Sequence, residues 1–139
     1  MDINYEVQPQ TYPPNLHGEL ILAKSDEMLV GRTGYVPWNF REYAQNGLNN
    51  ARMKIVNSFS DIEIDQSVRR RGVGLGLLDK LLDELMVKRF DLLIITQPDS
   101  QKRFYMKVFR ELSKRRKIAS YRYEIALGLG NVYEVKIEK

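Results

Sequence analysis

The segment from Asp61 to Leu85 constrains the fold more than any other part of the chain. It begins with apolar residues that alternate with acidic ones, which is typical of a half-buried β-strand. A basic, glycine-rich turn over residues 67–76 follows, and from Leu77 to Arg89 leucines recur at helical spacing. The continuous apolar run Phe90–Thr96 is typical of a parallel strand that follows a crossover helix. The segment therefore predicts a strand, a turn, a helix and a second strand.

Alternating apolar and polar residues predict further strands on both sides of this unit. These strands are expected at residues 2–8, 19–23, 28–36, 52–65, 118–126 and 132–137. Residues 8–17 contain three prolines, so we expect an extended connection there, without a long helix. A second helix is expected after Pro98, with Asp99 or Ser100 as its N-cap. Its buried stripe would consist of Phe104, Tyr105, Val108, Phe109 and Leu112.

The order of these elements predicts one α/β (α+β) domain over residues 1–139. Its sheet would be mixed and mostly antiparallel, with a central parallel pair of strands and flanking helices. A domain of this length buries roughly two thirds of the surface of its unfolded chain. Residues 37–50 fit either a short helix or a long loop, which could face a substrate or fill the core with its aromatic side chains.

The composition excludes several classes of site. The chain has no cysteine, which rules out disulfides, thiolate metal sites and cysteine nucleophiles, and which fits a cytoplasmic location. His17 is the only histidine, so a histidine metal site or a Ser-His-Asp triad is not expected. No apolar run approaches the ~20 residues that span a membrane. We therefore expect no metal and no membrane partner.

Positive charge is concentrated in the second half of the chain. Residues 68–117 hold 14 Lys and Arg against 6 Asp and Glu, although the whole chain has a net charge of only +4. Arg69, Arg70 and Arg71 lie in the glycine-rich turn, directly before the predicted helix. Backbone N–H groups at the positive end of a helix bind anions, and arginine adds full charges. The turn therefore predicts a phosphate site.

Two familiar phosphate motifs do not fit this turn. A Walker loop needs a lysine and then Ser or Thr directly after its last glycine, and neither is present. The dinucleotide fingerprint needs G-x-G-x-x-G, but Gly72, Gly74 and Gly76 are spaced two apart. Asp91 is near the distance of a ribose-binding acid, but it begins its strand and does not end it. A nucleotide-cofactor dehydrogenase is therefore disfavoured.

The run IEIDQSVRRRGVGLGLL resembles motif A of the GCN5-related N-acetyltransferase (GNAT) family, in which a strand is followed by R/QxxGxG/A at the start of a helix. Arg69, Gly72 and Gly74 occupy the motif positions, and Leu77 and Leu78 form the apolar pair that follows. The resemblance extends over nearly the whole chain from residue 19. The hairpin at 19–36, the helix at 99–115 and the last hairpin resemble the corresponding elements of the family.

By this resemblance, the bound anion would be the pyrophosphate of acetyl-CoA. Backbone N–H groups of residues 70–76 would hold it, and the strand at 62–64 would pair with the pantetheine arm and polarise the acetyl carbonyl. The activity implied is acetyl-CoA-dependent acetyl transfer to a primary amine of a small molecule, peptide or protein. The implied cofactor-binding residues are Ile62, Ile64, Arg69, Arg70, Arg71, Gly72, Val73, Gly74, Leu75 and Gly76.

The resemblance also indicates catalytic candidates. The family commonly protonates the departing thiolate with a tyrosine on the helix after the last parallel strand, and Tyr105 has the matching position. Tyr105 also lies on the apolar stripe of its helix, where an aromatic usually belongs to the core. Glu63 is the best-placed candidate for a general base, either direct or through a water, although a surface carboxylate on the polar face of the strand is the favoured interpretation. Asp61 and Asp65 are weaker candidates.

The chain departs from the family pattern in two places, one near the acceptor site and one at the end of the tyrosine helix. The two helices that usually follow the first strand, and that wall the acceptor site, have no counterpart in residues 8–18. The acceptor site could therefore be open, completed by residues 37–50, or completed by a second subunit of a homodimer. The usual Gly-Phe at the end of the tyrosine helix is replaced by Val108-Phe109, which puts the alignment of Tyr105 in doubt.

Two other functional classes stay open on the sequence alone. The basic region from Lys102 to Lys117 would suit a nucleic-acid-binding module or an acetyltransferase directed to nucleic acid. Simple nucleic-acid binding would not require the glycine-rich turn, and a CoA 3′-phosphate also attracts positive charge, so this class is not favoured. A catalytically inactive GNAT-like interaction subunit is the third possibility.

Overall fold

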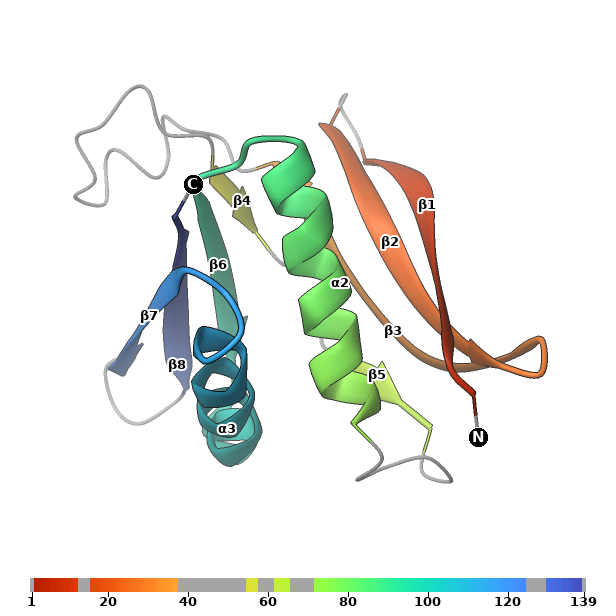
Figure 1. Ribbon diagram of the computed structural model, residues 1–139. Helices are drawn as coiled ribbons and strands as arrows, with labels where there is room; N and C mark the ends of the chain where they lie inside the picture. The colour runs from red at the N-terminus through yellow and green to blue at the C-terminus, as the bar shows by residue number, and fades with distance from the viewer. Residues whose placement is uncertain are drawn as a thin grey trace.

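The computed structural model (Figure 1) describes residues 2–12, 16–37, 55–57, 62–65, 72–124 and 130–138. Its strands are β1 (Asn4–Tyr12), β2 (Leu16–Ser25), β3 (Met28–Pro37), β4 (Ile55–Asn57), β5 (Glu63–Ile64), β6 (Leu92–Gln97), β7 (Ile118–Glu124) and β8 (Asn131–Ile137). They form one sheet in the order β1-β2-β3-β4-β6-β8-β7, and β5 pairs with β3 beside this path. The predicted fold class, a mixed and mostly antiparallel sheet with flanking helices, is confirmed. Residues 38–50 lie outside the described residues.

The first two strands form a direct hairpin. Asn4 pairs with Lys24 and Tyr12 with Leu16, so only residues 13–15 separate the two strands. The expected extended connection over residues 8–17 is wrong, because most of it belongs to β1 and β2. β1 is an edge strand, where a proline such as Pro9 is tolerated because one side of the strand needs no ladder hydrogen bonds.

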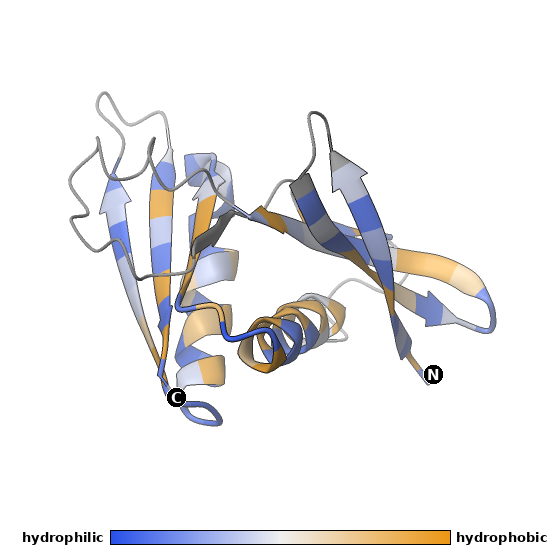
Figure 2. Ribbon diagram, turned by 90° about the horizontal axis from the view of Figure 1, so that it is seen from above, coloured by the Kyte–Doolittle hydropathy of each residue, from blue (hydrophilic) through white to orange (hydrophobic). Residues whose placement is uncertain are grey.

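The sheet opens where one continuous strand was expected over residues 52–65. β4 pairs antiparallel with β3 and parallel with β6, where Asn57 lies opposite Ile94. β5 instead pairs only with β3 among the described strands, through Gly31 and Arg32. The described parts of the predicted strand therefore pair differently, β4 with both β3 and β6 and β5 with β3. Figure 2 shows the two halves of the sheet diverging, with helix α2 in the angle between them.

Helix α2 spans Val73–Val87 and packs against both halves of the sheet. Its predicted apolar face is confirmed, since Leu78, Leu81, Leu82 and Leu85 are at most 1% exposed. The helix begins four residues before the predicted start, so Gly74 and Gly76 lie in its first turns and not in a preceding loop.

Helix α3 (Lys102–Ser113) follows a short 3-10 helix, η2 (Asp99–Gln101), and lies beside α2 (Figure 1). Most of its predicted apolar stripe is buried in the core shared with α2, β6 and β8, while Phe104 is only partly buried. The predicted side-chain cap is wrong, because neither helix start has a side-chain cap hydrogen bond. Asp99 instead accepts a hydrogen bond from the Asn131 amide at 3.0 Å, which ties η2 to β8.

Candidate functional site

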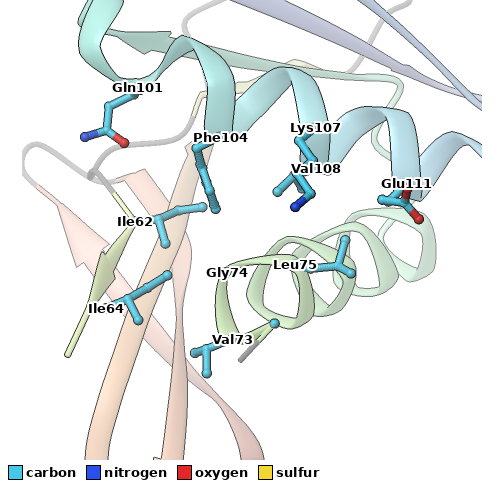
Figure 3. A pocket seen from close by; sticks show the side chains of 11 residues that line it. Ile62, Ile64, Val73, Gly74, Leu75, Gln101, Phe104, Lys107, Val108 and Glu111 are labelled. Carbon is cyan, nitrogen blue, oxygen red and sulfur yellow. The ribbon is translucent and has the colours of Figure 1, made fainter. Parts of the chain in front are cut away.

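A groove of about 750 Å³ lies where β5, the first turn of α2 and one side of α3 meet (Figure 3). β5 and the residue before it contribute the apolar side chains of Ile62 and Ile64. α3 contributes both apolar and charged side chains to the opposite wall. The lining residues are Ile62, Ile64, Gly72, Val73, Gly74, Leu75, Gln101, Phe104, Lys107, Val108 and Glu111.

The start of α2 gives the groove an anion-binding end. Gly72 precedes the helix with φ 79°, a left-handed conformation that favours glycine. The first amide that bonds back within the helix is that of Gly76, which donates to the Gly72 carbonyl at 2.9 Å. The amides of Val73, Gly74 and Leu75 come before it, so they have no partner within the helix and point out of its positive end. This geometry suits a phosphate.

Gly74 is required by close packing at this end of the groove. A Cβ atom on Gly74 would lie 2.6 Å from Cζ of Phe104 and 3.0 Å from Cδ1 of Ile64. A larger side chain would therefore displace the Phe104 ring or the Ile64 side chain. The glycine allows the three walls of the groove to approach one another.

Gly76 lies where α2 packs against the first strand. Its amide is already engaged in the helix, and a Cβ atom on it would lie 1.9 Å from Oη of Tyr5 on β1. Gly76 thus allows α2 to pack on the first strand. Its assignment to the phosphate site stays a prediction.

The structure adds residues that the sequence analysis did not assign to a site. The opposite wall comes from α3, where Phe104, Lys107, Val108 and Glu111 point toward α2 and β5 (Figure 3). Their spacing of three and four residues was a detectable signal, but it did not reveal which element the helix would face. Lys107 brings a positive charge to the groove. Arg69, Arg70 and Arg71 lie outside the described residues.

Tyr105 lies in the core beside the groove and is not one of the residues that line it. Its side chain is 2% exposed, and its ring centroid lies 5.1 Å from that of Tyr133 and 6.1 Å from that of Phe109. Phe104 packs edge-on against it, with ring centroids 5.0 Å apart. Its assignment as a proton donor stays a prediction, and its position supports the alternative of a core aromatic.

Glu63 lies on the other side of its strand from the groove. Side chains alternate along a strand, so Ile62 and Ile64 face the groove while Glu63 faces away from it. Its carboxylate accepts a hydrogen bond from Nε of Arg32 at 2.9 Å, and both side chains are exposed to solvent. The hydrogen bond from Arg32 lowers the pKa of Glu63, which makes the carboxylate a weaker base. The base assignment also stays a prediction.

Two searches of the described residues gave negative results. No group of three or more His, Asp or Glu side chains in this part of the chain could hold a metal ion. No helix within it is long and apolar enough to cross a membrane.

Solved structures share the fold at low sequence identity. A ribosomal-protein-alanine N-acetyltransferase from Brucella melitensis matches with a TM-score of 0.59 and 15% identity, over 87% of this chain and 69% of that one. A GNAT family acetyltransferase from Elizabethkingia anophelis with acetyl-CoA bound matches with a TM-score of 0.59 and 16% identity, over 98% and 99% of the two chains.

A third similar structure is the ribosomal-protein-S18-alanine N-acetyltransferase from Escherichia coli, with a TM-score of 0.53 and 14% identity over 85% of this chain and 66% of that one. No protein-family model and no curated protein sequence matches the chain. At these identities the similarity establishes the fold alone.

Proposed function

Because the chain has the fold of the GNAT acetyltransferases, we propose that it is an acetyl-CoA-dependent N-acetyltransferase that transfers an acetyl group to a primary amine. The observation that carries this proposal is the groove itself. It lies between β5 and α3 and ends at the start of α2, where the amides of Val73, Gly74 and Leu75 have no partner within the helix.

The lining of the groove fits an acetyl-CoA molecule. The amides of Val73, Gly74 and Leu75 would hold the pyrophosphate, and Lys107 would add a positive charge on the opposite wall. The side chains of Ile62 and Ile64 give the pantetheine arm an apolar surface. A volume of about 750 Å³ is within the range of small-molecule pockets. When bound, acetyl-CoA supplies the activated acetyl thioester.

The chain's own residues would bind and orient the donor. Phe104 and Val108 close the apolar side of the groove and exclude water from the arm. Backbone groups of residues 62–64 would align the arm and polarise the carbonyl, as the resemblance implies. Arg69, Arg70 and Arg71 remain candidates for phosphate contacts, Tyr105 for the acid and Glu63 for the base.

The identity of the acceptor is the open part of this proposal. A small amine, a peptide and a protein amine all remain candidates, and a homodimer that completes the acceptor side remains a prediction. A cytoplasmic location belongs to the same proposal and agrees with a sequence that contains no cysteine. A screen of acetyl transfer over amines and peptides would identify the acceptor class.

Calorimetric titration with acetyl-CoA tests the donor site. We expect Lys107→Glu to weaken binding at least tenfold, or about 1.4 kcal/mol, because it places a negative charge beside the phosphates. The matched control is Arg103→Glu, which makes the same charge change on α3 at a residue that does not line the groove. Failure of the unmodified protein to bind acetyl-CoA would overturn the proposal, and equal weakening by both variants would remove Lys107 from the site.

A further inference from the structure

The outer face of α3 carries an unusual concentration of positive charge. Between Lys102 and Lys117 the chain has eight lysines and arginines and a single glutamate. Arg103, Lys107, Arg110 and Lys114 are spaced four, three and four residues apart, so they share one side of the helix. All four are exposed, and Arg115 and Lys117 extend the exposed charge beyond the helix end. We call these six residues the basic face.

Most of this charge is not compensated by acidic neighbours. Within the described part of the chain, Lys114 is the only member of the basic face that forms an ion pair, with Glu111 at 3.2 Å. Two lysines elsewhere are paired: Lys24 with Glu6 at 2.9 Å, and Lys88 with Glu19 at 2.6 Å. An exposed surface of like charges that repel one another is stabilised by an anionic partner.

The shape of the basic face points to a polyanion and not to a bilayer. A helix that lies in a membrane surface must insert its apolar side, but the apolar side of α3 is already buried in the core. The four helical cations span roughly 16 Å at a rise of 1.5 Å per residue. Their spacing of about 4.5 to 6 Å is of the same order as the charge spacing along a nucleic-acid strand, about 3.4 Å.

The aromatic residues of α3 distinguish a duplex from a single strand. Proteins that bind single strands stack the bases on exposed aromatic rings. The aromatic residues of α3 are Phe104, Tyr105 and Phe109, and none of them is exposed. The helix therefore offers cations for phosphates but no surface for bases, which suits double-stranded nucleic acid.

We propose that the basic face of α3 binds a nucleic-acid duplex through its phosphate backbone, independently of base sequence. This surface is distinct from the donor groove, because Lys107 alone belongs to both. If about five cations contact phosphates, the logarithm of the binding constant should fall with the logarithm of salt concentration with a slope near −4.5. Affinity would then fall about 500-fold between about 50 and 200 mM salt.

Fluorescence anisotropy with a labelled short DNA duplex of mixed sequence tests this proposal on the whole protein. The double variant Arg103→Glu, Arg110→Glu should bind at least tenfold more weakly and should reduce the magnitude of the salt slope by about two. The control is Lys24→Glu, Lys136→Glu, which makes the same change in net charge on β2 and β8. It should stay within about threefold of the unmodified protein. Circular dichroism verifies that both variants fold.

Three results would overturn the proposal. They are no binding by the unmodified protein at low salt, equal losses in both double variants, and binding only to vesicles that contain phosphatidylserine. Equal binding of an RNA duplex with the same salt slope would support the proposal, because RNA and DNA duplexes both present backbone phosphates. Acetyl-CoA titration of the Arg103→Glu, Arg110→Glu variant should match that of the unmodified protein, so the two proposals can fail separately.

Discussion

Arg116, which follows α3, is predicted to hold the two helical walls of the groove together. Its Nε donates to Oδ1 of Asp79 at 2.7 Å, and its Nη2 donates to the Asp79 carbonyl at 2.9 Å and to Asp83. Its Nη1 lies 3.4 Å from the sulfur of Met86. The side chain is only 13% exposed, so these contacts to α2 are partly shielded from water.

The structure allows the size of this contribution to be estimated. Hydrogen bonds between charged groups contribute about 1.5 to 3 kcal/mol each when well buried. The side chains of Asp79 and Asp83 are 37% and 51% exposed, so water would solvate them if the arginine were removed. We therefore expect Arg116→Met, which keeps the aliphatic length, to lower the free energy of unfolding by about 2 kcal/mol in total.

Urea unfolding followed by far-ultraviolet circular dichroism measures this difference. The matched control is Arg115→Met, at an exposed neighbour, which should change the free energy of unfolding by less than about 0.5 kcal/mol. A double-mutant cycle with Asp79→Asn should give a coupling energy of at least about 1 kcal/mol. If the two arginine variants are equally stable, the contacts of Arg116 make no net contribution to the free energy of unfolding. Apolar packing alone would then set the distance between α2 and α3.

Two further predictions concern residues that the sequence placed in the site. Gly76→Ala should lower the unfolding midpoint but leave acetyl-CoA affinity unchanged, because the new Cβ atom would meet Tyr5. Adding Tyr5→Leu to this variant should restore part of the lost stability. Weaker acetyl-CoA binding at unchanged stability would instead support Gly76 as a phosphate-binding residue. The hydrogen bond from Arg32 lowers the pKa of Glu63, so its contribution to stability is present above the unfolded-state pKa and is lost as the pH falls through the folded-state pKa. If Glu63 is not the base, the pH profile of the rate should keep any limb near pH 7 in the Glu63→Gln variant. Loss of such a limb in this variant would contradict the lowered pKa of Glu63.

The elements with strong periodicity were predictable from the sequence, and their boundaries were not. The prediction of the leucine face of α2 is confirmed, because with helical spacing only one orientation of the helix buries all four leucine side chains. The start of the helix was wrong by four residues, since Gly74 and Gly76 indicate a turn when only their neighbours in sequence are considered. Inside the helix, a Cβ atom at either position would collide with Phe104 or Tyr5, which are far away in sequence. No local pattern contains that information.

Only one wall of the candidate site could be predicted from the sequence. The geometry of the α-helix explains why the other wall could not. The motif indicated the wall made by β5 and the start of α2, but the other wall depends on how α3 is rotated about its axis. Successive residues of a helix point about 100° apart, so a shift of one residue in the alignment changes the direction of the side chain. The structure turns Phe104 toward Gly74 and packs Tyr105 against Phe109 and Tyr133. A sequence motif that names a tyrosine therefore fixes the helix but not the direction of its side chain. The role of Tyr105 as a proton donor stays a prediction.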